Sequence, residues 1–259
     1  MGERIDWASV GWERLAAGVG RVRLPGFDCT VGLVAGRGAA LLVDAGGSPR
    51  EGARLRAETD RLLGAAGGVT HLALTHAHFD HVLGAAAFAG AAVYGAAGLG
   101  AFLAQGGAEL YADAVRHGTD RREAAAGVGT LTAVHHEVDG TAEGDGTRTL
   151  ELGGGVRARL VAAGPGHTRY DLAVLVPGGP ADPPVVFCGD LVEESGAPQA
   201  GPDAVPDRWP AALDRLLRLG GEDAVYVPGH GAAVDAAFVR WQRDALTARF
   251  GVSEPPGVS

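Results

Sequence analysis

The stretch THAHFDH at residues 75–81 places three histidines and one aspartate within seven positions. His76 and His78 are two residues apart, so in an extended segment their side chains leave the backbone on the same side and can hold one ion together. Asp80 and His81 follow in the turn and can point toward a neighbouring position. Imidazole and carboxylate groups suit Zn²⁺, and also Fe²⁺ or Mn²⁺. A second ion needs further ligands from elsewhere in the chain.

Three later residues are ligand candidates because each follows a glycine at the end of a β-like run. His167 stands in GPGHT, Asp190 in CGD and His230 in VPGHG. Glycine permits the tight turns and close backbone approach that a metal site at a sheet edge needs. A lone buried histidine is more often a core residue than a ligand, but several ligand-type groups at successive strand ends indicate a shared site. The other histidines lack this context: His71, His117, His135 and His136.

Apolar runs separated by turn residues predict an α/β chain that begins with short strands. Ser48 and Pro49 have the residue types of an N-cap and a first helical position, which predicts a helix over 49–65. Strands are expected at 19–24, 30–35, 39–44, 69–75, 131–138, 147–152, 156–162, 172–176, 185–188 and 224–227, and helical segments at 99–126, 210–219 and 235–250. No linker divides the chain, so we expect one domain over residues 1–259, with 1–18 and 252–259 peripheral.

One pattern occurs twice. Asp60 opens the sequence DRLL, which leads through a glycine turn and a strand to His76, sixteen residues later. Asp214 opens a second DRLL, which leads in the same way to His230, also sixteen residues later. The repeat has two interpretations: β/α units resemble each other because they pack alike, or the fold is pseudo-duplicated and brings the two strand-end histidines to one edge.

Composition restricts the partners. The net charge is −9, and every basic residue is arginine, which argues against a nucleic-acid or anionic membrane surface. Two cysteines far apart in sequence give no disulfide framework, and no apolar signal segment or membrane-spanning run is seen. We therefore expect a cytoplasmic protein with a small-molecule substrate. Homo-oligomerisation stays open.

The motifs Asp44, THAHFDH, GPGHT, CGD and PGHG stand in an order that resembles the metallo-β-lactamase-fold hydrolases over roughly residues 19–250. The resemblance implies a four-layer αββα sandwich of two mixed β-sheets (α/β, or α+β). It also implies that Asp44 orients the histidine loop without binding metal. The implied ligands are His76, His78 and His167 for the first metal, Asp80, His81 and His230 for the second, and Asp190 as a bridge between both.

This resemblance implies two divalent ions, Zn²⁺ in the first place with iron or manganese as alternatives. The chemistry that follows is hydrolysis of an ester, thioester or lactone of a small molecule by a metal-bridging hydroxide. Asp80 is then both ligand and general base. The alternatives are a phosphodiesterase on the same two metals, a mononuclear-iron oxidoreductase like the persulfide dioxygenases, and a non-catalytic metal scaffold.

Several positions bear on the substrate. The antibiotic-hydrolysing classes usually carry cysteine or serine where Asp190 stands, and the acyl-homoserine lactonases carry tyrosine where Glu193 stands. Arg169 and Tyr170 follow the GHT motif, and two interpretations stay open: they line the substrate pocket, or they face solvent at a strand start. Glu193 and Glu194 are expected in a solvated turn; the alternative is that they repel anionic substrates. The segment 99–138 is expected to cover the substrate.

Overall fold

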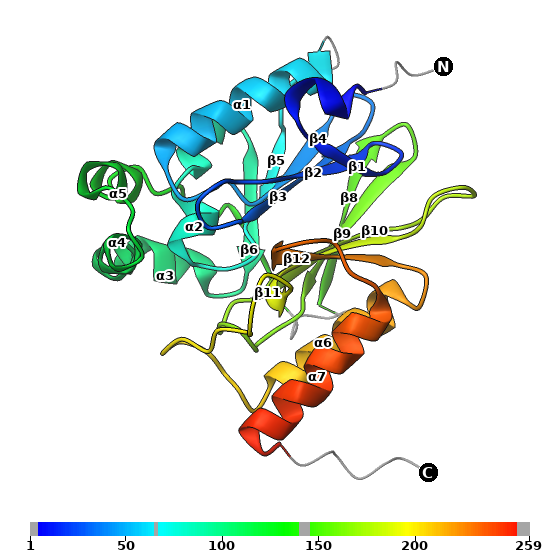
Figure 1. Cartoon of the computed structure of the whole chain (residues 1–259). Helices are drawn as coiled ribbons and strands as arrows, with labels where there is room; N and C mark the ends of the chain where they lie inside the picture. The colour runs from blue at the N-terminus through cyan, green and yellow to red at the C-terminus, as the bar shows by residue number, and fades with distance from the viewer. Residues whose placement is uncertain (1–4, 65–66, 140–145, 253–259) are drawn as a thin grey trace.

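The computed structural model describes residues 5–64, 67–139 and 146–252, and these form two β-sheets packed against each other with helices on the outer faces (Figure 1). The first sheet has seven strands in the order β1 to β7, and the second has five in the order β12-β11-β10-β9-β8. Each sheet is mixed. In the first sheet β3 and β4 are antiparallel and β4 and β5 are parallel; in the second, β9 and β10 are antiparallel and β11 and β12 are parallel. The predicted sandwich of two mixed sheets is confirmed.

The strands of the first sheet come from the N-terminal half of the chain. Their bounds are β1 (Glu13–Ala16), β2 (Val19–Arg23), β3 (Thr30–Ala35), β4 (Ala40–Val43), β5 (His71–Ala73), β6 (Ala92–Ala96) and β7 (His136–Val138). Those of the second sheet are β8 (Thr147–Gly153), β9 (Val156–Ala162), β10 (Leu172–Val176), β11 (Val185–Glu193) and β12 (Val225–His230).

Helices form the two outer layers. They are η1 (Trp7–Val10), α1 (Pro49–Leu63), α2 (Phe79–Val82), η3 (Ala85–Phe88), α3 (Leu99–Gln105), α4 (Gly107–Arg116), α5 (Arg121–Val128), α6 (Trp209–Gly220) and α7 (Ala236–Phe250). Helix α1 lies over the first sheet, whereas α6 and α7 lie together over the second (Figure 1). Among the described residues, no helix has the length and apolar character needed to cross a bilayer.

Three apolar layers hold the sandwich together. Val34, Leu41, Leu160 and Val174 are fully buried among the side chains that the two sheets share. A second cluster joins the first sheet to α1 and its neighbours, and a third joins the second sheet to α6 and α7. At roughly 25 cal/mol per Å² of buried apolar surface, such layers supply most of the folding free energy. The two layers of strands are therefore rigid supports for the loops at their ends.

Some predicted elements differ from the structure in length. The segment 99–126 is divided into α3, α4 and α5, with Gly106 between the first two and Asp120 as the N-cap of α5. Of the predicted strand 131–138, only His136–Val138 is a strand, because pairing with β6 begins at His136. The strand predicted at 185–188 instead runs on to Glu193.

The repeated sequence pattern has a counterpart in the fold. The two repeats correspond to strand–helix–strand units with parallel strands, β4-α1-β5 in the first sheet and β11-α6-β12 in the second. The first sheet continues with two further parallel pairs, β5 with β6 and β6 with β7. Asp44 directly follows β4, and His230 ends β12. The two units are topologically equivalent, and the packing rules for parallel strands are sufficient to produce that equivalence.

Candidate metal centre

Asp44 ties together the two ends of the histidine loop. Its carboxylate is buried; Oδ1 accepts a hydrogen bond from the backbone N–H of Thr75 at 2.8 Å, and Oδ2 accepts one from Thr75 Oγ1 at 2.8 Å. His81 Nδ1 donates to the same Oδ2 at 2.9 Å. Asp44 has a positive φ of 63°, an unusual conformation for a residue other than glycine. Hydrogen bonds from a carboxylate, such as the one that His81 donates to Asp44, hold a metal-binding histidine in one orientation.

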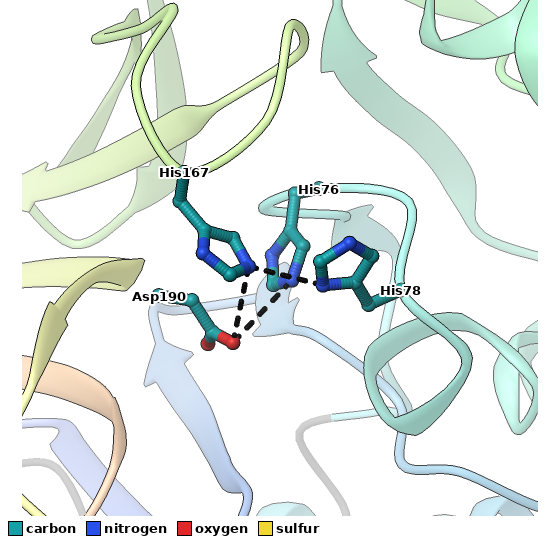
Figure 2. Close-up of side chains that lie close together, drawn as sticks. All are labelled: His76, His78, His167 and Asp190. Atoms are coloured by element: carbon teal, nitrogen blue, oxygen red, sulfur yellow. Dashed lines mark hydrogen bonds and ion pairs between the residues drawn. The ribbon is translucent and has the colours of Figure 1, made fainter. Parts of the chain in front are cut away.

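The first group of ligand-type side chains contains His76, His78, His167 and Asp190, whose ligand atoms all lie within 4.8 Å of one another (Figure 2). His78 Nδ1 is 3.0 Å from His167 Nε2. Asp190 Oδ2 lies 3.6 Å from His76 Nε2 and 3.4 Å from His167 Nε2. Two of these residues follow β5, one precedes β10 and one lies in β11, so both sheets contribute.

The second group lies beside the first and shares Asp190 with it. His81, Asp190 and His230 form a cluster that satisfies the same distance limit. Asp190 Oδ1 is 3.2 Å from His81 Nε2, and Asp190 Oδ2 is 3.3 Å from His230 Nε2. Asp80 Oδ2 lies 3.2 Å from His230 Nε2 and 3.6 Å from His81 Nε2. The structure thus brings all seven predicted ligands together around Asp190, and Asp80 forms a further cluster of ligand-type side chains with His81 and Cys29.

Two buried polar atoms at the centre test whether metal fits. His76 Nε2 and Asp190 Oδ1 have no hydrogen-bond partner among the described residues, although both are shielded from solvent. Leaving such a group unpaired costs about 1–3 kcal/mol. In addition, the nitrogens of His78 and His167 face each other across 3.0 Å. A cation between these atoms would satisfy all of them, so the residues present fit divalent metal.

The protonation states support the same conclusion. Burial lowers the pKa of His167 to about 4 and that of His76 well below its usual value, so both imidazoles are neutral, which is the form that binds metal. Burial opposes ionisation of Asp190, but the histidines around it, His81 first, outweigh burial and hold its pKa well below the ordinary range. Burial also opposes a charge on His230, but Asp190 and Asp80 raise its pKa to about 12. The site therefore attracts positive charge.

Each histidine of the centre has its other ring nitrogen held by a partner, which fixes the nitrogen that faces inward. The partners are Thr75 Oγ1 for His76, Asp203 for His78, Asp44 for His81, the carbonyl of Gln199 for His167 and the carbonyl of Phe27 for His230. Sequence reasoning predicted only Asp44 in this role. Asp203 lies in a loop without a strand end or a metal motif, so the sequence carries no signal for it.

Cys29 was also not predicted near the centre. Its Sγ donates a hydrogen bond to the carbonyl of Asp80 at 3.3 Å and lies 3.7 and 3.9 Å from the two ring nitrogens of His81. Burial raises the pKa of this thiol to about 11, so it is neutral at pH 7. Its backbone forms an isolated bridge with His230. The residue is part of the packing beneath the second group.

A cavity of about 590 Å³ opens over both groups. Its lining includes His78, Asp80, His167, Asp190 and His230, together with residues of α4 and of the loop that follows β11. The segment 99–138, which was expected to cover the substrate, lines the cavity in part, through Phe102 of α3, Leu110 of α4 and His117 directly after α4. Five of the seven predicted ligands also line the cavity, whereas His76 and His81 do not.

The two residues after GHT do not line this cavity. Arg169 is exposed, and Tyr170 packs on Phe102 with ring centroids 5.7 Å apart. The reason is a tight turn, in which Asp171 accepts hydrogen bonds from the N–H and Oγ1 of Thr168 and turns the intervening residues away. Glu193 was placed wrongly, because it is buried at the end of β11 and faces the cavity instead of solvent.

The comparisons with known proteins agree with this architecture. A family model described as the metallo-beta-lactamase superfamily matches residues 24–230. The solved structure of the metallo-beta-lactamase FIM-1 from Pseudomonas aeruginosa, in its mono-zinc form, superposes with a TM-score of 0.66 at 20% sequence identity. The superposition covers 93% of this chain and 96% of that one, and it shows a common fold. No match to a curated protein was found. The chain belongs to the metallo-beta-lactamase superfamily.

Proposed function

We propose that this chain is a binuclear metal-dependent hydrolase that cleaves an ester, thioester or lactone of a small molecule. One observation carries the proposal: two ligand groups share Asp190 and border a cavity. When bound there, two divalent ions, preferably zinc given the imidazole and carboxylate donors, would lower the pKa of a coordinated water to about 7 and polarise the carbonyl oxygen of the substrate.

Asp80 is the candidate general base. Its buried carboxylate lines the cavity, and Oδ2 is 3.2 Å from His230 Nε2. Burial opposes its ionisation, but His81 and His230 outweigh burial and lower its pKa, so the carboxylate is ionised and can accept a proton from an attacking water. The hydrogen bond between Cys29 and the carbonyl of Asp80 holds the backbone of this residue in place.

Charge in the cavity favours an ester over a phosphodiester. Among the described lining residues Arg116 is the single arginine, and its guanidinium is paired with Asp113 at 2.7 Å. Glu109 and Glu193 also face the cavity. A phosphodiester anion would be repelled by these carboxylates. Phosphodiester cleavage and a single-iron oxidoreductase are therefore the alternatives that an experiment has to separate from ester hydrolysis.

The first test combines metal analysis with a substrate panel. Purified protein is expected to hold about two zinc-like ions per chain and to hydrolyse nitrophenyl esters, thioesters or lactones faster than bis-nitrophenyl phosphate. Asp80→Ala should lower kcat/KM by about 10²–10⁴, which is the usual contribution of a general base. His117→Ala, whose ring lies over Phe79 and outside both ligand groups, should keep the full metal content.

Three results would contradict the proposal. One iron per chain with oxygen uptake on a persulfide would assign the protein to the oxidoreductases. Preference for the phosphodiester would reassign the substrate class. Equal metal loss in Asp80→Ala and His117→Ala would mean that the centre is misplaced.

A further inference from the structure

The cavity beyond the ligand groups has one aromatic side. Phe27 and Phe79 meet edge to face with ring centroids 5.0 Å apart, and His117 stacks on Phe79 at 5.7 Å. Phe102 and Leu110 add further apolar surface. Phe27, Phe79, Phe102 and Leu110 come from the loop before β3 and from α2, α3 and α4, and they pack in one apolar cluster that borders the cavity.

Other residues of the lining carry negative charge. Glu193 is buried at the end of β11, and its Oε1 accepts hydrogen bonds from the N–H and Oγ of Ser195 at 3.0 and 2.6 Å. Glu109 lies on α4, toward solvent. Arg116 is occupied by Asp113 and is mostly exposed. No unpaired arginine is thus available, among the described lining residues, to hold a carboxylate or phosphate of a substrate.

We infer that the cavity selects substrates whose acyl part is apolar and carries no negative charge. The predicted turnover rests on the proposed hydrolase function, whereas the predicted binding preference does not. The aromatic wall receives the acyl chain, and Glu109 and Glu193 disfavour a chain that ends in a carboxylate. Esters and thioesters whose acyl chain ends in a carboxylate are thereby disfavoured. Simple alkyl esters, and lactones with an alkyl substituent, fit the cavity.

A matched pair of non-reacting ligands tests the binding directly. Hexanamide and the monoamide of adipic acid have the same chain length and the same amide end, but the second ends in a carboxylate in place of a methyl group. Isothermal titration of the zinc-loaded protein is expected to give at least a tenfold lower Kd for hexanamide. Equal affinities, or tighter binding of the acid, would overturn the inference.

The same comparison is made in turnover with 4-nitrophenyl hexanoate and the 4-nitrophenyl monoester of adipic acid, whose carboxylate is too far from the ester to attack it through a small ring. We expect at least a tenfold higher kcat/KM for the hexanoate, and a rise of about threefold for each methylene added from butyrate to hexanoate. If the binding preference is found but no ester is cleaved, the pocket inference stands and the proposed hydrolysis fails. If esters are cleaved but neither comparison shows a preference, hydrolysis stands and the pocket inference fails.

Two variants assign the preference to the walls. Glu109→Gln should reduce the difference in affinity between the two amides by about threefold, as expected for the loss of one exposed charge. Its control is Glu151→Gln, an exposed residue of β8, which should leave the difference unchanged. Phe102→Ala should reduce the gain per methylene, whereas Trp241→Ala, whose side chain is 61% exposed on α7, should leave it unchanged. If Glu109→Gln or Phe102→Ala behaves like its control, that residue does not determine the preference. If both variants behave like their controls, the inference is overturned.

Discussion

At the scale of single residues, the centre depends on side chains that hold the ligands as much as on the ligands themselves. His78 Nε2 donates to Asp203 Oδ2 at 3.1 Å, which leaves Nδ1 facing His167. A carboxylate behind a metal-binding imidazole fixes the ring and makes the ligand nitrogen more basic, and its loss commonly weakens metal binding by about 10–100-fold.

Asp203→Ala is therefore expected to weaken zinc binding to one of the two positions by about 10–100-fold and to leave the other nearly unchanged. Competition with a chromophoric chelator measures the two Kd values. Asp207→Ala is the matched control, because this aspartate is exposed, lies in the same loop and, within the part of the chain that the structure describes, forms an ion pair with Arg208 alone. Asp203→Asn, which retains an acceptor oxygen, should recover part of the affinity. Unchanged affinity at both positions in Asp203→Ala would show that the contact does not support the ligand.

At the scale of elements, one glycine within β11 and one near the end of β12 set how closely the two strands approach the metal centre. A Cβ on Gly189, which has a positive φ of 55°, would lie 2.8 Å from Cβ of Thr75. A Cβ on Gly229 would lie 1.8 Å from Asp190 Oδ1. Gly229 is thus required for the position of the Asp190 carboxylate. Gly189 is required for the close approach of β11 to Thr75 at the start of the histidine loop.

Gly229→Ala should displace Asp190 and lower metal content at both positions together, since both ligand groups include this carboxylate. Metal analysis and circular dichroism on the same sample distinguish loss of the site from loss of the fold. Gly179→Ala, where an added Cβ meets nothing within 4 Å, provides the control. Full metal content in a folded Gly229→Ala protein would contradict the proposed bridging position of Asp190.

At the scale of the whole molecule, the ligands join the two halves of the sandwich. The histidine loop follows β5 of the first sheet, whereas Asp190 and His230 belong to strands of the second. A metal that binds the folded state alone adds RT ln(1 + [L]/Kd), or about 4 kcal/mol at 1,000 times Kd. Metal bound between the sheets should therefore stabilise the sandwich as a unit.

Removal of metal by a chelator should lower the unfolding temperature by about 8–16 °C, given roughly 2–4 °C per kcal/mol for a domain of this size. Readdition of zinc should restore it. In Asp190→Ala, the same chelation should change the unfolding temperature little, because both ligand groups are incomplete. Identical melting of chelated and zinc-loaded wild-type protein would show that metal does not connect the sheets.

Much of the centre is predictable from sequence because ligand chemistry belongs to the residue type. The cluster at 75–81 and the glycine-flanked His167, Asp190 and His230 stand out without any contact information. The strand Leu172–Val176 follows from a continuous apolar run and the strand Val156–Ala162 from a run in which polar and apolar residues alternate at first, and the bounds of both agree with the prediction. In these segments the local pattern and the packed environment favour the same conformation.

Other features were decided only by tertiary structure. Asp203 and His78 are separated by 125 positions in sequence, and nothing local to either residue indicates their contact. Whether Arg169 lines the pocket or faces solvent is not readable from its sequence context, and the turn held by Asp171 leaves it exposed. The sequence by itself determined the ligand types, their order and the family of folds. Which nitrogen faces the centre, which walls form the cavity and which charges remain unpaired were decided by tertiary structure, because these depend on side chains that meet only after both sheets have packed.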